Sequence, residues 1–161
     1  TLGGRAAADL PRLPGALHNR LGIAVAAQTY RAYRELLAAP RWHQLASAGA
    51  HVQRPLWAST GTKDPAAPDT LYVEALAAPD TINTLPEKTL FAFSDHGKVQ
   101  PSLQGDGGDT TIAQCREAGI DIDALAEQLQ REGAESFSQS WAKLLDNLAG
   151  KAKAAPGKAA A

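Results

Sequence analysis

Methionine is absent from the 161 residues of this sequence, and cysteine occurs once. The lone Cys115 cannot form an internal disulfide or contribute to a metal site built from several cysteines. Independence from disulfides is typical of a reducing compartment, so we expect a cytoplasmic protein. The missing initiator methionine leads us to expect a product that was processed, trimmed or cut from a longer chain.

Long apolar runs and an excess of one charge are also lacking. No apolar stretch approaches the roughly 20 residues that a membrane-spanning helix needs, and no charged start followed by an apolar run marks a signal peptide. The 16 basic and 17 acidic residues leave a formal net charge of -1. This balance provides no electrostatic attraction for nucleic acid or an anionic membrane, so we expect neither as a partner.

The first two thirds of the sequence alternate between helical and strand-like patterns. Apolar residues recur at helical spacing until Pro40, which cannot continue a helix. Short apolar runs bounded by Gly and Pro read as strands, and Pro55 is awkward inside the first of them because it cannot donate to a sheet. The expected order is helix 22–37, helix 42–47, strand 52–59, loop 59–69, helix 70–76, strand 81–84 and helix 87–94, the last with Leu90 and Phe93 facing inward.

Helical patterns dominate the C-terminal part. We expect a helix at 109–118 that ends at Gly119, then a helix that breaks at Gly133, and a last helix at 134–148 with one apolar face. Residues 149–161 are Ala, Lys, Gly and Pro and have little to bury, so we expect a disordered tail there.

Strands that alternate with helices indicate parallel pairing and an α/β fold. Two strands alone do not make a stable parallel sheet with both faces covered, so we expect partner strands outside this chain. The predicted organisation is one structural unit at 1–148, followed by the tail at 149–161.

Small polar side chains gather where the two predicted strands end, at 59–63 and at 81–84. Ligands of α/β proteins bind at the carboxyl ends of parallel strands. Hydroxyl groups, a glycine that lets backbone N–H groups approach and Lys63 would together suit an anion. A polar loop without a ligand remains the alternative on composition alone.

Lys63 allows three interpretations. A Schiff-base nucleophile needs a desolvated amine with a depressed pKa, whereas the adjacent Asp64 favours the charged form. We therefore prefer an anion contact over a covalent role, and a solvent-exposed lysine without function stays open.

The remaining chemically active residues show weak patterns. The four histidines lack metal-ligand spacing, and we expect no metal and no cofactor. Asp95 and His96 suggest a catalytic dyad, but neighbours in sequence need not face one another, and no serine nucleophile motif accompanies them. Cys115 falls inside a predicted helix and is best explained as a buried small apolar residue.

The segment Arg54-Pro-Leu-Trp-Ala-Ser-Thr-Gly-Thr-Lys-Asp-Pro65 resembles transaldolases of the type found in actinobacteria and cyanobacteria. The similarity continues through Asp69-Thr-Leu-Tyr-Val-Glu74 and Pro79-Asp-Thr-Ile-Asn-Thr-Leu-Pro86, and it covers roughly residues 16 to 148. The chain is thus similar to the C-terminal portion of such an enzyme. The resemblance implies part of a (β/α)8 TIM barrel, about strands 7 and 8, with C-terminal helices.

The resemblance also implies an activity. Transaldolases of the pentose phosphate pathway transfer a dihydroxyacetone unit from sedoheptulose 7-phosphate to glyceraldehyde 3-phosphate through a lysine Schiff base, without a cofactor. Their catalytic lysine and carboxylates belong to earlier barrel strands, which this chain lacks. We therefore expect an inactive fragment that needs a missing N-terminal barrel segment as its partner.

Site residues carry over from the resemblance one by one. Ser59 matches the family's phosphate-binding serine, and Lys63 would replace an arginine that many relatives place shortly after it. Thr60 and Gly61 would complete the phosphate site, with Asn83 and Thr84 near the barrel mouth. A non-catalytic remnant that binds sugar phosphate or a partner chain is the main alternative, and a related Schiff-base aldolase is a third.

Overall fold

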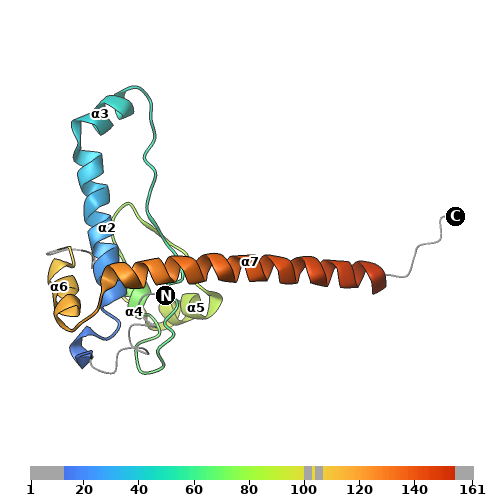
Figure 1. Ribbon diagram of the computed structural model, residues 1–161. Coiled ribbons are helices and arrows are strands. Elements are labelled where there is room, and N and C mark those ends of the chain that lie inside the picture. The colour runs from blue at the N-terminus through green and yellow to red at the C-terminus, as the bar shows by residue number, and fades with distance from the viewer. Residues whose placement is uncertain (1–12, 100–102, 104–106, 155–161) are drawn as a thin grey trace. The chain divides into compact units, whose positions relative to one another are not determined.

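The computed structural model describes residues 13–99, 103 and 107–154. The chain divides into two compact units, Thr1–Ile120 and Asp121–Ala161 (Figure 1). This division lies earlier than the predicted boundary after Leu148. The first unit contains every residue of the predicted site.

The first unit begins with a short 3-10 turn, η1 (Gly15–Leu17), and helix α2 (Leu21–Ala38). Leu21, Ala24 and Ala27 are its buried residues, and their spacing of three places them on one face. Pro40 occupies the first turn of helix α3 (Pro40–Ser47), where its missing N–H interrupts no helical hydrogen bond. The predicted pair of helices separated by a proline is confirmed.

Two short strands pair in parallel, β1 (Leu56–Trp57) with β2 (Ile82–Asn83). Two backbone bonds flank the pair, from Ile82 N–H to the Pro55 carbonyl and from Thr84 N–H to the Trp57 carbonyl, each 2.9 Å long. The prediction of a strand over the whole of 52–59 is wrong in its extent, because Pro55 has no N–H to extend the ladder and Ser59 turns the chain away. The parallel α/β pairing is confirmed.

Only one face of this two-stranded sheet is covered in the first unit. Trp57 is 9% exposed and packs in a cluster with Ala27, Leu76 and Leu103, whereas Leu56 is 53% exposed on the other face. The other strand repeats the pattern, since Ile82, the partner of Leu56, is 45% exposed. The predicted strand buried on both faces is therefore not realised within the described residues.

Three further helices complete the first unit. Helix α4 (Leu71–Ala75) follows the loop after β1, helix α5 (Glu87–His96) follows β2, and helix α6 (Asp109–Glu117) packs against α2. These bounds confirm the predicted helices at 70–76, 87–94 and 109–118.

Details of α5 and α6 divide between confirmation and correction. Leu90 does not face inward, since it is 49% exposed, and Thr89 is the buried residue of α5 instead. Cys115 in α6 is fully buried, as predicted. Gly119 ends the turn after α6 with a φ of 90°, and its N–H donates to the carbonyl of Arg116.

The second unit is built around one helix, α7 (Ile122–Ala154), of 33 residues. The predicted break at Gly133 is wrong, because an isolated glycine costs a helix about 1 kcal/mol and does not end it. Residues 149–154 continue α7, so the prediction of disorder is wrong for them. Alanine and lysine are good helix formers and extend the last turns. Residues 155–161 lie outside the described residues.

A stripe of large apolar side chains on α7 is exposed to solvent: Phe137, Trp141, Leu144, Leu145 and Leu148. Their spacing of three and four places them along one side of the helix, as the sequence predicts. No described helix combines the length and the apolar character that crossing a membrane requires.

Candidate functional site

The loop that leaves β1 begins with a strained residue. Ser59 has a φ of 59°, one of three positive values among the described residues other than glycine. The left-handed conformation costs a residue with a Cβ roughly 1–2 kcal/mol. Ser59 is exposed and lies two residues beyond the end of β1. Such strain at a strand end is typical of functional loops.

Thr60 anchors this loop to the end of β2. It is 2% exposed, and its hydroxyl shares its proton between Oδ1 of Asn83, at 2.7 Å, and the carbonyl oxygen of Thr84, at 3.1 Å. With these acceptors inside the protein, Thr60 positions the loop and presents no hydroxyl to solvent. The predicted phosphate-site residue Thr60 thus has a structural role in this arrangement.

Gly61 lets the loop approach the start of α5. A Cβ at this position would lie 3.1 Å from Cγ of Pro86 and 3.4 Å from Oγ1 of Thr89. The first distance is closer than ordinary van der Waals contact, so a larger residue would require Pro86 or the loop to shift by a few tenths of an ångström. Glycine therefore suits the close packing at this position.

Lys63 extends from the same loop and is exposed. No ion pair of Lys63 is found within residues 13–99, 103 and 107–154. Its neighbour Asp64 accepts hydrogen bonds from Nδ2 of Asn19 at 2.7 Å and from the Ala66 N–H at 2.9 Å, and these bonds lower the pKa of that carboxyl. Asp64 is thus directed towards Asn19, and Lys63 stays exposed on the same loop as Ser59.

Asn83 and Thr84 close the opposite side of the loop. The Thr84 hydroxyl donates to the Trp57 carbonyl at 3.2 Å, which ties it to β1. Nδ2 of Asn83 and Nε1 of Trp57 are buried and have no hydrogen-bond partner among the described residues. A buried donor without a partner costs about 1–3 kcal/mol. The Nδ2 group of Asn83 therefore has no acceptor among the described residues.

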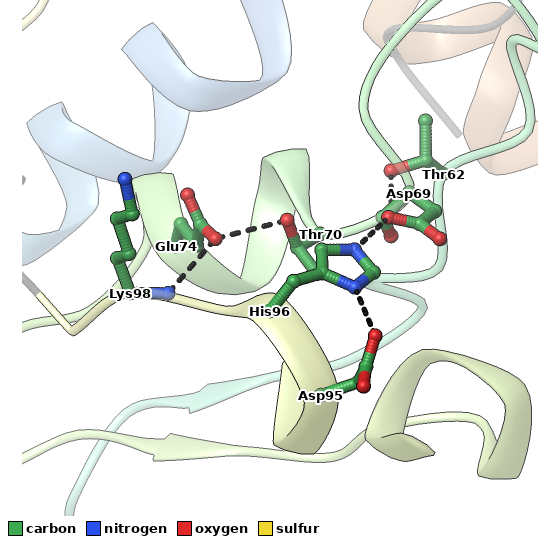
Figure 2. Close-up of polar contacts among 7 residues, drawn as sticks. All are labelled: Thr62, Asp69, Thr70, Glu74, Asp95, His96 and Lys98. Carbon is green, nitrogen blue, oxygen red and sulfur yellow. Dashed lines mark hydrogen bonds and ion pairs between the residues drawn. The ribbon is translucent and has the colours of Figure 1, made fainter. Parts of the chain in front are cut away.

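A cluster around His96 connects the far end of the loop to α5 (Figure 2). Nε2 of His96 lies 2.9 Å from Oδ1 of Asp69, and Nδ1 lies 3.1 Å from Oδ2 of Asp95. The hydrogen bond to Asp69, then the one to Asp95, raises the pKa of His96, while the bond from His96 lowers the pKa of Asp69. The paired carboxylates favour the imidazolium form, in which both ring nitrogens donate.

Sequence reasoning weighed Asp95 with His96 as a possible dyad and did not include Asp69. The contact with Asp95 does form, yet the partner that links His96 to the loop is Asp69, 27 residues earlier. No local spacing signals a pair so far apart. No group of three or more His, Cys, Asp and Glu side chains that suits a metal ion is found in the described part of the chain.

Comparison with known proteins shows which family this chain belongs to. The family model described as Transaldolase/Fructose-6-phosphate aldolase matches residues 4–148. The chain is 47% identical to a transaldolase of Frankia alni over 137 residues, which are 83% of this chain and 37% of that protein. It is 48% identical to a transaldolase of Acidothermus cellulolyticus over 128 residues, which are 78% of this chain and 34% of that protein.

A transaldolase of Thermobifida fusca is 44% identical over 137 residues, 83% of this chain and 37% of that protein. The chain therefore spans little more than a third of the length of the curated relatives it matches. The family implies a TIM barrel, and the parallel pair β1 and β2 with its flanking helices is consistent with a C-terminal part of one. The family match and these identities show that the chain belongs to the transaldolase/fructose-6-phosphate aldolase family.

Proposed function

We propose that this chain is the C-terminal part of a transaldolase and that it supplies part of the site that holds the substrate's phosphate. One observation carries the proposal: Ser59 and Lys63 stand exposed on a loop that is fixed at the ends of two parallel strands. Thr60 and Gly61 hold that loop in place through the Asn83 hydrogen bond and the close approach to Pro86.

The loop has the chemistry that a sugar phosphate needs. The Ser59 hydroxyl is a neutral donor, and the Lys63 ammonium supplies a positive charge as a compact point. Asp64 does not cancel that charge by a direct bond, because its oxygens accept from Asn19 and Ala66. The arrangement favours an anion contact for Lys63 over a covalent role, which needs a desolvated amine.

In the whole enzyme a lysine from an earlier barrel strand would form the Schiff base with the ketose. The dihydroxyacetone unit would then pass from sedoheptulose 7-phosphate to glyceraldehyde 3-phosphate, with no cofactor, in the pentose phosphate pathway. This chain would contribute positioning and charge, and Nδ2 of Asn83 would find its partner in the missing segment or in the substrate. The buried free thiol of Cys115 fits a reducing, cytoplasmic setting.

Borohydride trapping tests the division of labour. We expect no covalent adduct when this chain alone is treated with fructose 6-phosphate and borohydride. When the chain is mixed with the N-terminal two thirds of the Frankia alni transaldolase, we expect an adduct on the added part. An adduct on Lys63 of the isolated chain would refute the proposed role of that lysine.

Phosphate binding tests the site itself. Inorganic phosphate added to the mixed protein is expected to shift the NMR signals of the Ser59 and Lys63 amides, and Lys63→Gln is expected to weaken that response. Lys143→Gln on α7 is the matched control, because it removes one exposed positive charge from the second unit. If both variants weakened the response equally, net charge would explain the effect, and Lys63 would have no specific role in binding phosphate. Phosphate binding without any adduct in the mixture would favour the alternative, a non-catalytic remnant that binds sugar phosphate.

A further inference from the structure

We propose that His96 is a positioning residue, which holds the loop of Ser59 and Lys63 against α5 through Asp69 and holds it less firmly when the imidazole loses its proton. The proposal rests on the proposed function only in taking that loop as the holder of the phosphate. The geometry of the cluster in Figure 2 carries the rest.

The loop is attached to α5 at both ends of the helix. At the start of α5, Gly61 packs against Pro86 and Thr89. At its end, Asp69 accepts the hydrogen bond from Nε2 of His96 at 2.9 Å. A change at either attachment therefore acts on the segment between them, which includes Lys63.

A short chain of hydrogen bonds leads from His96 to the neighbour of Lys63. The carboxylate of Asp69 binds His96, and the carbonyl oxygen of Asp69 accepts from the Thr62 hydroxyl at 3.3 Å. Thr62 directly precedes Lys63. The backbone that carries Lys63 is thus linked to Asp69 through its neighbour Thr62.

The end of α5 is built so that His96 points at this carboxylate. The Gly97 N–H donates to the Phe93 carbonyl at 2.9 Å, and a Cβ on Gly97 would overlap the Phe93 ring, so only glycine fits. Beyond it, the Lys98 N–H donates to Oε1 of Glu74 at 3.0 Å, and the Thr70 hydroxyl donates to the same oxygen at 2.9 Å. This second attachment keeps the start of α4 beside the end of α5 when the His96 bond weakens, so the effect falls on the loop that precedes Thr70.

The charges around His96 determine when its bond to Asp69 is strong. Asp69 of the loop and Asp95 of α5 face the two ring nitrogens, and Lys88 of α5 acts on Asp69. Glu74 of α4 is engaged by Thr70 and Lys98. The hydrogen bond to Asp69, then the one to Asp95, raises the pKa of His96, and the same contact lowers the pKa of Asp69. The charged bond is therefore fully present below the ordinary histidine value of 6.5 until acid protonates Asp69, and it weakens to a neutral hydrogen bond as pH rises through the raised pKa of His96.

The test uses this chain without any ligand, so failure of the proposed function leaves its result readable. NMR follows the His96 ring and the amides of Thr62 and Lys63 from pH 5 to 9. We expect the amide signals to change with the midpoint of His96 and to report greater mobility above it. In His96→Gln and in Asp69→Asn, we expect the amides to lose this pH response and to resemble the high-pH state throughout.

Two variants separate positioning from a general structural effect. Asp95→Asn keeps the bond to Asp69 and removes one aspartate, so the midpoints of His96 and of the Thr62 and Lys63 amides should fall together. His18→Gln should leave them unchanged, although His18 acts on Asp64 in the same loop. Amide midpoints that stay fixed while that of His96 moves would overturn the proposal. If His96→Gln does not fold, the wild type and Asp95→Asn decide alone.

Discussion

The hydroxyl of Thr60 donates to Oδ1 of Asn83 across 2.7 Å and thereby joins two segments that lie 23 residues apart. The same proton is shared with the Thr84 carbonyl, so the start of one loop is bound to the end of the neighbouring strand. This relationship explains how an exposed serine and an exposed lysine keep a defined place on a chain with only two short strands described.

Thr60→Val should destabilise the first unit. Valine has nearly the same shape but no hydroxyl, so Oδ1 of Asn83 and the Thr84 carbonyl would lose this donor beside the buried Thr60 position. We expect a loss of about 1–3 kcal/mol in the free energy of unfolding, measured by urea denaturation. Thr60→Ser keeps the hydroxyl and should lose less. A valine variant as stable as the wild type would contradict the anchoring role.

Glycine at position 59 should give a more stable protein than alanine at the same position. At a φ of 59°, the Cβ of alanine stays strained while glycine does not, so Ser59→Gly should be more stable than Ser59→Ala by about 1 kcal/mol. Ser94 inside α5 provides the opposite control, because alanine is favoured over glycine there by about 1 kcal/mol. Thermal unfolding of the four variants checks both orders. If alanine were more stable than glycine at position 59, as it is expected to be at position 94, Ser59 would not be strained.

Gly133→Ala should increase the helix content of the second unit. Nothing lies within 4 Å of a Cβ built at Gly133, and the residue sits inside α7, so alanine should stabilise the helix by up to about 1 kcal/mol. Circular dichroism at rising temperature measures the gain. Gly150→Ala is the matched control near the end of α7, where a smaller gain is expected because helix ends fray. If Gly133→Ala lost helix content, the finding that α7 runs without a break through Gly133 would be contradicted.

Asp109 should make the contact between α2 and α6 sensitive to acid. Its carboxylate accepts from Arg31 at 2.6 and 3.0 Å and from Gln28 at 2.8 Å, and the bonds from Arg31, then Gln28, lower the pKa of Asp109 to about 2. A lowered pKa contributes stability that is present above the ordinary value of 3.8 and is lost as pH falls through about 2.

The measurement compares melting temperatures of the wild type and Asp109→Asn between pH 7 and pH 2. We expect the variant to melt lower at pH 7 and the difference to shrink towards pH 2. Asp146→Asn removes an exposed carboxylate of α7 and should show no comparable trend. A difference between wild type and Asp109→Asn that stays constant with pH would exclude the ion pair as its cause.

Local patterns predicted the helices of the first unit because each carries its own signal. Pro40, Pro86 and Gly119 mark helix boundaries through backbone chemistry that needs no distant partner. The strands were harder, because a strand's length depends on what pairs with it, and β1 pairs over two residues only. The predicted helix break at Gly133 was wrong for a related reason. The free-energy cost of one glycine is small compared with the stabilisation of a helix of 33 residues.

The candidate site followed a similar rule. The polar residue types predicted a loop at the strand ends, where the structure places it, and the transaldolase motif identified the family; the binding of a ligand by this loop stays a prediction. The roles inside the loop were not predictable, because Ser59 and Thr60 are neighbouring hydroxyl residues in the sequence, yet Ser59 is exposed and Thr60 is buried in the folded loop. The link from His96 to Asp69 depends on the folded path of 27 residues and has no counterpart in local sequence.

The reactivity of the buried Cys115 thiol can be used to measure local opening of this protein. The Cys115 side chain on α6 is fully buried, which blocks access of reagents. Burial also raises the pKa of the thiol, so the reactive thiolate is disfavoured while the helix stays in place. A thiol label can react only during moments when α6 lifts from its neighbours. The labelling rate therefore reports how often α6 opens. Because the sequence has no second cysteine, all labelling occurs at Cys115.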